Sequence, residues 1–258
     1  MNIKQLFDLT GKTAIITGGG RGLGAQIAEG FAEAGANLIL CSRRVESCEE
    51  TAVRLREKTG AQCIALPCDV RKPEDVQRVV EQAIEQFGRI DILVNNSGAS
   101  WGAPAADMPL EAWNKVMDIN VTGTFLMSQA VGRLMIDQKQ GKIINIASVA
   151  GLCGTDPKFM DAVGYSASKG AVISFTKDLA VKWGRYNINV NAIAPGFFPT
   201  KMSQELLNRG GNHILSYTPL ARFGTDQDLK GSAVFLASDA SNFITGSILT
   251  VDGGMSAM

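Results

Sequence analysis

The chain alternates short apolar runs with longer amphipathic segments. The apolar runs are four to six residues long and rich in β-branched side chains, which predicts buried strands. They cover residues 12–17, 37–41, 62–66, 91–94, 142–146, 188–193 and 248–251. Between them, apolar residues recur at three- and four-residue spacing and predict helices over 23–34, 45–59, 73–87, 117–135 and 165–183, and from about residue 225. Strands and helices in this alternation indicate a parallel sheet covered on both faces.

The 258 residues are 45% hydrophobic and 19% charged, enough to bury one large core. Linkers, low-complexity tracts and internal repeats are not apparent in the sequence. We therefore expect one Rossmann-like domain over residues 1–258. Its predicted fold is doubly wound α/β, with a seven-stranded, mostly parallel sheet and helices on both faces.

The charge balance is even, with 25 Lys plus Arg and 25 Asp plus Glu. It therefore gives no electrostatic reason to expect a nucleic-acid or membrane partner. The sequence also lacks an apolar run of the roughly 18 residues that a membrane helix needs. We expect a cytoplasmic protein.

The potential metal ligands are sparse. The five cysteines form no C-x-x-C pair, so they are expected to be reduced thiols, mostly buried as small apolar side chains. The only histidine is His213. A metal site is therefore not expected.

A glycine cluster separates the first predicted strand from the first long helix. Its candidate cofactor-binding residues are Gly18, Gly20, Arg21, Gly22, Leu23 and Gly24. In this place, backbone amides and a helix N-terminus can meet a pyrophosphate. From the residues alone, a flexible turn between strand and helix is an equal alternative.

The end of the second predicted strand bears on which dinucleotide would bind. An acidic residue there would bind the ribose hydroxyl of NAD, but the chain has Ser42 and Arg43, both able to donate to a 2′-phosphate. We expect NADP(H) in preference to NAD(H), although Arg43 could also belong to an ordinary solvated helix start. Asp69 and Val70, after the third strand, are candidates for the adenine end, where Asp69 could equally cap a turn.

Tyr165 and Lys169 are four residues apart in a predicted helix and so share a face. A tyrosine has an ordinary pKa of about 10, and lowering it to roughly 7 takes about 4 kcal/mol. One ammonium roughly 4 Å away supplies about 4 kcal/mol at an effective dielectric of about 20. The pair can therefore make an acid–base group if the site excludes water.

Taken together, six motifs resemble the short-chain dehydrogenase/reductase family along essentially the whole chain. They are Thr17-Gly18-x3-Gly22-x-Gly24, Asn95-Asn96-Ser97-Gly98, Asn120, Ser148, Tyr165-x3-Lys169 and Pro195-Gly196. Within the family, the chain looks most similar to 3-oxoacyl thioester reductases, followed by gluconate and polyol dehydrogenases.

The resemblance implies a role for each catalytic candidate. Tyr165 would protonate the carbonyl oxygen, and Lys169 would lower the pKa of Tyr165 and hold the nicotinamide ribose. Ser148 would bind the substrate oxygen, and Asn120 would anchor a water that links Lys169 to solvent.

The resemblance also implies further cofactor contacts and a homotetramer. The cofactor contacts would come from Asn96, Gly98, Pro195, Gly196, Phe198 and Thr200, in addition to Tyr165 and Lys169. Asn96 and Gly98 would also have a structural role beside the fourth strand.

The substrate region departs from the family pattern, because residues 155–161 enlarge the loop between Ser148 and Tyr165. A substrate lid is expected at about 200–218. Bulky candidates for the substrate mouth are Trp101, Phe159, Phe197 and Met202, half of which could instead be core contacts.

These features predict NADPH-dependent reduction of a ketone to a secondary alcohol, with a 3-oxoacyl thioester or related β-keto compound as substrate. The expected partner is thus a small carbonyl or alcohol compound, either free or carried by CoA or acyl-carrier protein. Gluconate or polyol dehydrogenation is the alternative, and a non-catalytic NADP(H)-binding sensor is the second alternative.

Overall fold

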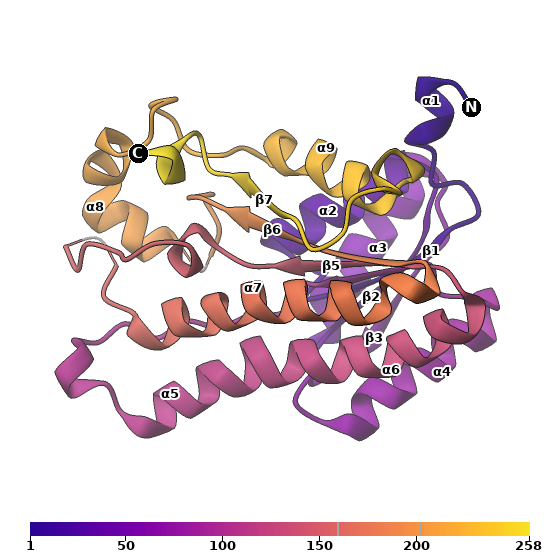
Figure 1. Cartoon of the computed structure of the whole chain (residues 1–258), viewed down its shortest axis with the longest axis horizontal. Helices are drawn as coiled ribbons and strands as arrows, with labels where there is room; N and C mark the ends of the chain where they lie inside the picture. The colour runs from indigo at the N-terminus through magenta and orange to yellow at the C-terminus, as the bar shows by residue number, and fades with distance from the viewer. Residues whose placement is uncertain (159, 202) are drawn as a thin grey trace.

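The computed structural model describes residues 1–158, 160–201 and 203–258 (Figure 1). Its seven strands form one parallel sheet in the order β3-β2-β1-β4-β5-β6-β7. The strands are β1 (Thr13–Thr17), β2 (Asn37–Ser42), β3 (Cys63–Pro67), β4 (Ile92–Asn95), β5 (Gly141–Ile146), β6 (Ile188–Pro195) and β7 (Ile248–Val251).

Helices connect the strands and cover the sheet. They are α1 (Ile3–Leu6), α2 (Gly22–Glu33), α3 (Val45–Thr59), α4 (Pro73–Phe87), α5 (Leu110–Met117), α6 (Gly123–Gln138), α7 (Val163–Trp183), α8 (Gln204–Ser216) and α9 (Asp226–Ala237). In Figure 1, α5, α6 and α7 lie on one side of the sheet and α2 and α9 on the other, with α8 at one end.

The two faces of the sheet bury separate apolar cores. Neighbouring residues of β1 point to opposite faces, so Ile16 packs with Phe31 of α2 and Leu229 of α9. Ile15 belongs to the other core, with Val79 of α4 and Met127 of α6. Because both faces are covered, the strands read as continuous apolar runs in the sequence.

The predicted doubly wound α/β fold is confirmed, and the sheet is parallel throughout the described strands. The helix predicted over 117–135 is longer and interrupted, since a π-helical turn, η2 (Asp118–Thr122), joins α5 to α6. Such a turn adds a residue to the helix and changes the direction of nearby side chains. Here it contains the buried Asn120.

The order of the strands creates a crevice at their carboxyl ends. The chain runs outward from β1 through β2 to β3 and then returns to β4 on the other side of β1. Ligands of such sheets bind where the order reverses. The glycine loop after β1 and the asparagines after β4 therefore lie at this crevice.

A buried chain of polar side chains joins the sheet to α6 and α7 beneath the crevice. The Asn95 amide of β4 donates to Asn145 of β5 at 2.8 Å and to Ser128 of α6 at 2.9 Å. Asn145 in turn donates to Thr176 of α7 at 2.9 Å. These bonds fix the relative positions of the elements that carry the site.

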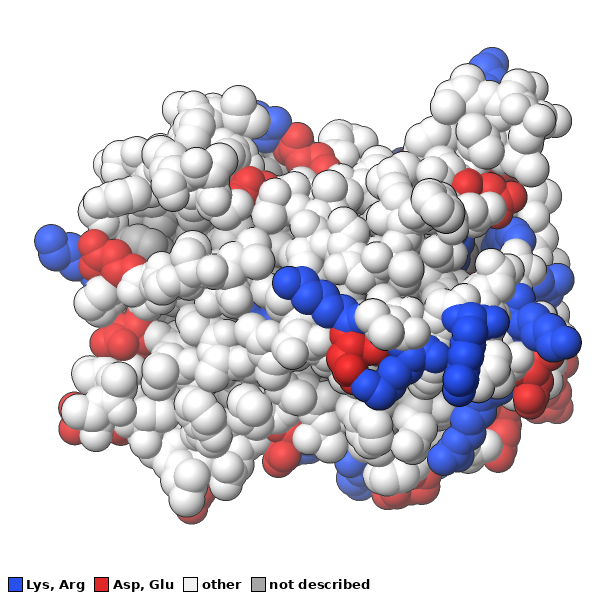
Figure 2. Space-filling view, viewed as in Figure 1, with Lys and Arg blue, Asp and Glu red and all other residues white. Residues whose placement is uncertain are grey.

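The charged surface is mixed. Figure 2 shows basic side chains gathered toward the end of the visible face where α7 ends, with acidic side chains among them. None of the helices formed by the described residues is long and apolar enough to cross a membrane.

Lys142 is a buried cation at the amino end of β5, far along the sheet from the crevice. Its side chain is 8% exposed, and its Nζ donates to Ser241 at 3.3 Å. Burial lowers the pKa of Lys142 to about 8, against an opposing effect of the Asp239 charge. The protonated form is therefore favoured more in the unfolded chain than in the folded one.

We expect Lys142→Met to stabilise the protein at pH 7, by on the order of 1 to 3 kcal/mol. The pKa of Lys142 is lower in the folded protein than in the unfolded chain. The free energy of unfolding of the wild-type protein should therefore rise between about pH 8 and about pH 10.5 as Lys142 loses its proton in the folded state. This rise should be absent from the variant. Chemical denaturation across this range measures both effects. Lys177→Met, at an exposed position of α7, is the control; a variant less stable than wild type at pH 7 would contradict the expectation.

Candidate active site

The first turns of α7 carry Tyr165 and Lys169 on one face. Lys169 is only 5% exposed, and its Nζ lies 5.6 Å from the centre of the Tyr165 ring. The ammonium donates to the carbonyl oxygen of Ile146, the last residue of β5, at 2.7 Å. This bond connects the helix to the carboxyl end of the sheet and partly compensates the burial of the charge.

The pKa values of the pair are set mainly by burial. Burial raises the pKa of the Tyr165 phenol, and a hydrogen bond with Ser148 acts in the opposite direction. Burial also lowers the pKa of Lys169 to about 8. The predicted net lowering of the tyrosine pKa by Lys169 is therefore not seen, because desolvation of the phenolate dominates and the ammonium is directed to the Ile146 carbonyl.

Ser148 reaches Tyr165 through a tight turn after β5. The Ser148 hydroxyl accepts from the Ala150 amide at 3.2 Å and caps the short helix η3 (Val149–Gly151). A Cβ on Gly151 would lie 2.6 Å from the backbone carbon of Lys169. The turn therefore packs directly on the backbone of α7, which brings the Ser148 hydroxyl to the phenol.

Asn120 serves as a clamp between three segments. Its Oδ1 accepts from the Ala99 amide at 2.8 Å, while its Nδ2 donates to the Ala99 carbonyl at 2.9 Å and to Ser168 at 2.8 Å. Ser168 then donates to the carbonyl of Tyr165 at 2.7 Å. Both Nδ2 hydrogens are therefore used, and a water on Asn120 would need Oδ1 or the backbone carbonyl as its acceptor.

The sequence did not reveal the clamp because Ala99 contributes only backbone atoms. Ser168, however, lies inside the Tyr165–Lys169 motif, and its spacing from Tyr165 could have indicated the bond to the Tyr165 carbonyl.

The loop after β4 borders the same space. A Cβ added to Gly98 would lie 3.5 Å from Asn120 Oδ1 and 3.8 Å from Lys169 Nζ. Asn120 and Lys169 therefore both border Gly98, and Tyr165 adjoins this group through Lys169.

The glycine loop has the close packing of an anion-binding turn. Gly18 and Gly22 have φ of 65° and 53°, in the left-handed region that favours glycine. A Cβ on Gly24 would collide with the Gly18 carbonyl. Asn96, which follows the neighbouring strand β4, holds the loop, because its Nδ2 donates to the carbonyls of Thr17 at 2.9 Å and Gly18 at 3.1 Å.

The start of α2 is open to an anion. Its N-cap residue, Arg21, makes no side-chain capping bond. The first amides of α2 are therefore available to phosphate oxygens, and the helix dipole favours negative charge there. The residues present fit the pyrophosphate of a dinucleotide.

The adenosine end contains exposed basic side chains. Arg43 is exposed, whereas the Ser42 hydroxyl donates to the Arg44 carbonyl at 2.6 Å. Asp69 accepts from Arg71 at 2.9 Å, and hydrogen bonds from Arg71 lower the pKa of Asp69. Val70 is buried against Gly123 of α6, so its side chain forms part of the base of the adenosine end.

The segment after β6 lies beside the glycine loop. The Thr200 methyl carbon would lie 3.4 Å from a Cβ on Gly22, and the Gly196 amide donates to Val251 at 3.0 Å. Phe198 is different, since its side chain is 5% exposed and packs in the core against Gly224.

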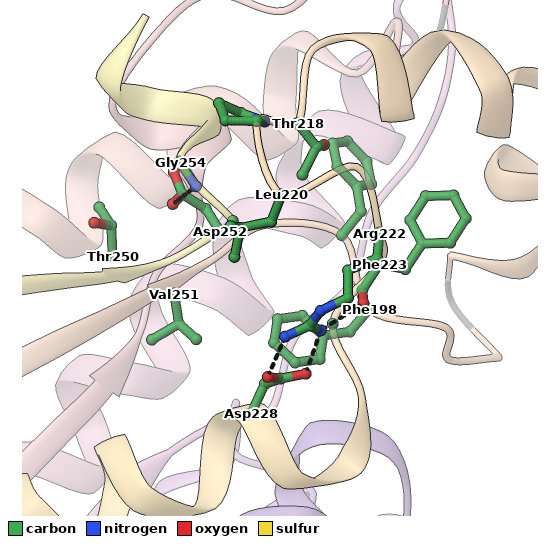
Figure 3. A pocket seen from close by; sticks show the side chains of 14 residues that line it. Phe198, Thr218, Leu220, Arg222, Phe223, Asp228, Thr250, Val251, Asp252 and Gly254 are labelled. Atoms are coloured by element: carbon green, nitrogen blue, oxygen red, sulfur yellow. Dashed lines mark hydrogen bonds and ion pairs between the residues drawn. The ribbon is translucent and has the colours of Figure 1, made fainter.

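A cavity of about 440 Å³ is lined in part by Phe197 and Phe198 of this segment. Figure 3 shows the side chains that line it. Phe198, Leu220 and Phe223 contribute apolar walls, and Arg222 makes two 2.8 Å hydrogen bonds to Asp228. The four catalytic candidates do not line it.

Two of the four substrate candidates lie in the described part of the chain. Trp101 is 45% exposed with Lys115 Nζ 6.0 Å from its ring, and Phe197 is half-buried and lines the cavity of Figure 3. Phe159 and Met202 lie outside the described residues. The segment predicted as a lid, 200–218, contains α8.

The geometry agrees with the comparisons to known proteins. A family model described as "Enoyl-(Acyl carrier protein) reductase" matches residues 18–256. The chain is 40% identical to 5-keto-D-gluconate 5-reductase of Escherichia coli K12 over 255 residues, 98% of each chain. It belongs to the short-chain dehydrogenase/reductase family.

Other relatives carry different substrate names. A 3-oxoacyl-[acyl-carrier-protein] reductase of Synechocystis is 38% identical over 248 residues, 96% of this chain and 98% of the relative. A gluconate 5-dehydrogenase of Burkholderia cenocepacia, solved with NADP and tartrate, superposes with a TM-score of 0.94 at 37% identity, with all of both chains covered. This short-chain dehydrogenase/reductase is an oxidoreductase that acts on CH–OH groups and uses a nicotinamide cofactor.

We expect Tyr165→Phe to lower kcat/KM for ketone reduction by about 10² to 10⁴, because the variant keeps the ring but loses the acidic proton. Cofactor binding, measured by fluorescence titration, should change little. Tyr186→Phe, remote from Ser148 and Lys169, is the matched control. Wild-type turnover by Tyr165→Phe would remove Tyr165 from the chemistry, whereas a wild-type protein that binds the cofactor but turns over no ketone would favour a non-catalytic nucleotide sensor.

Proposed function

We propose that this short-chain dehydrogenase/reductase reduces a ketone to a secondary alcohol with NADPH. The observation that carries the proposal is the position of Tyr165 beside the buried Lys169 ammonium, 5.6 Å from Nζ to the ring centre, with Ser148 near enough to lower the phenol pKa. Two hydroxyls that converge beside a cation can bind one carbonyl oxygen and give it a proton.

The residues of the chain would divide the reaction as follows. When bound, the nicotinamide cofactor supplies the hydride. Tyr165 gives its proton to the substrate oxygen, and Ser148 donates a hydrogen bond to the same oxygen. Lys169 stabilises the phenolate that remains.

Several features of the site support these roles. The phenol of Tyr165 is protonated in the free site, because burial raises its pKa, while Ser148 acts in the opposite direction. An ammonium has three donors, and Lys169 gives one to Ile146. The two remaining N–H donors of Lys169 can bind ribose hydroxyls and the phenolate oxygen. Asn120 positions Tyr165, because it donates to Ser168, which donates to the Tyr165 carbonyl.

The preference for NADPH rests on the adenosine end. Arg43 is exposed at the end of β2, where Ser42 replaces the acidic residue that would bind the ribose of NAD. A guanidinium binds phosphate through parallel hydrogen bonds, and Arg21 at the start of α2 can add a second positive charge.

The substrate proposal is a 3-oxoacyl thioester or related β-keto compound. Trp101 and Phe197, both with apolar surface near the mouth, favour a substrate with an apolar group. The second candidate is a keto-gluconate or polyol, favoured by the 40% identity to a 5-keto-D-gluconate reductase. Only the 3-oxoacyl thioester would reach the site attached to CoA or acyl-carrier protein.

The proposal includes a cytoplasmic homotetramer. β7 is an edge strand of the sheet, and Phe243, Leu220 and Val181 are large apolar side chains on the surface. Contact between copies would cover such groups.

A carbonyl-substrate panel with NADPH tests the substrate. We expect acetoacetyl-CoA to be reduced with kcat/KM at least about tenfold above that for 5-keto-D-gluconate, because one lost apolar contact already costs roughly tenfold. Oxidation of NADPH is followed by absorbance, with Tyr165→Phe as the blank. Turnover of 5-keto-D-gluconate without turnover of acetoacetyl-CoA would establish the polyol alternative.

The cofactor preference depends on Arg43. We expect Arg43→Gln to weaken NADPH binding by about 10- to 100-fold, because a hydrogen bond to a charged group contributes about 1.5 to 3 kcal/mol. NADH binding should change less than about threefold. Arg78→Gln, also exposed but on α4, is the control; equal weakening of both cofactors would show that Arg43 does not recognise the 2′-phosphate.

A further inference from the structure

The enlarged loop before α7 has a defined internal structure built around Asp156. The Lys158 amide donates to Asp156 Oδ1 at 2.9 Å, and the Met160 amide donates to the Asp156 carbonyl at 3.0 Å. The Thr155 hydroxyl donates to the Met160 carbonyl at 3.1 Å. These bonds connect the described residues Thr155, Asp156, Lys158 and Met160 to one another.

One end of this loop is attached to the segment that follows β4. Ala103 and Ala162 form an isolated parallel bridge, and the Ala103 amide donates to the Asp161 carbonyl at 2.9 Å. Ala162 immediately precedes α7, which carries Tyr165. The bridge therefore places the loop and the Trp101 segment side by side at the entrance to the site.

The other end of the loop meets α8. The carboxylate oxygen Oδ2 of Asp156 lies 3.4 Å from Nε2 of His213, within hydrogen-bond distance. The His213 ring also packs edge-on against Tyr217, with 5.0 Å between ring centres. Both partners are about one-third exposed, at 36% for His213 and 34% for Asp156.

We propose that Asp156 and His213 determine which substrates enter, by joining the enlarged loop to α8 as the outer wall of the substrate pocket. The inference rests on the proposed ketone reduction at Ser148 and Tyr165. Both wall segments are adjacent in sequence to site segments, since residues 155–161 lead into α7 and α8 follows Thr200. With the wall joined, compact ketones are held close to Tyr165, and an extended acyl group needs the two segments to separate.

Two variants separate the contact from the folding of each segment. Asp156→Ser keeps an oxygen that can accept from the Lys158 amide, but it is too short to reach His213. His213→Phe keeps an aromatic edge against Tyr217 and removes the nitrogen. The matched control is Asp178→Asn, which alters another exposed carboxylate pair, with Lys182 on α7.

Amide hydrogen exchange of the full-length protein reports the connection directly. Asp156→Ser should speed exchange in 204–216 two- to fivefold, and His213→Phe should do the same in 152–162, although each change lies in the other segment. The double variant should exchange no faster than the single variants. Additive effects, or acceleration only in the segment that carries the change, would overturn the proposal.

Kinetics with a short and a long 3-oxoacyl thioester test the consequence for specificity. Each variant should change the ratio of kcat/KM values in favour of the long substrate by two- to fivefold, through KM and with kcat within twofold of wild type. An unchanged ratio would overturn the assignment. If neither thioester is reduced by the wild-type protein, the proposed function fails, while the exchange experiment still decides whether the two segments are joined.

Discussion

The site depends on one buried ammonium. Lys169 would be costly to bury without a partner, and its hydrogen bond to the Ile146 carbonyl connects α7 to the end of β5. The same bond fixes the rotation of α7, and hence the direction in which Tyr165 points. A positive charge placed in this way attracts negative charge that develops nearby, without any movement of the protein during the reaction.

Around this cation, most of the positioning is done by groups that do no chemistry. Asn120 joins the Ala99 backbone to Ser168, and Asn95 and Asn145 connect the sheet to α6 and α7. These amides lie in low dielectric, where a broken hydrogen bond is expensive. The geometry of Ser148 and Tyr165 is therefore determined by the interior of the fold rather than by flexible surface loops.

The sequence predicted the features that depend on local spacing. Apolar runs identified the strands, and the four-residue separation of Tyr165 and Lys169 placed both on one face of a helix. Features that depend on long-range contacts were not predictable. The π-helical turn at Asn120, the buried side chain of Phe198 and the direction of the Tyr165 pKa all follow from neighbours distant in sequence. For Phe198, Gly224 leaves the space that its ring fills in the core.

The hydrogen bonds from Asn96 to the Thr17 and Gly18 carbonyls have a consequence for the kinetics of cofactor binding. A glycine-rich turn is normally the most disordered part of a chain, and closing it around a phosphate costs conformational entropy. Here the turn is restrained by a side chain from the neighbouring strand, so its ordering is completed when the sheet forms. Encounter with the dinucleotide then requires no loop closure, and the association rate is set by diffusion and the basic side chains at the crevice rather than by a conformational search.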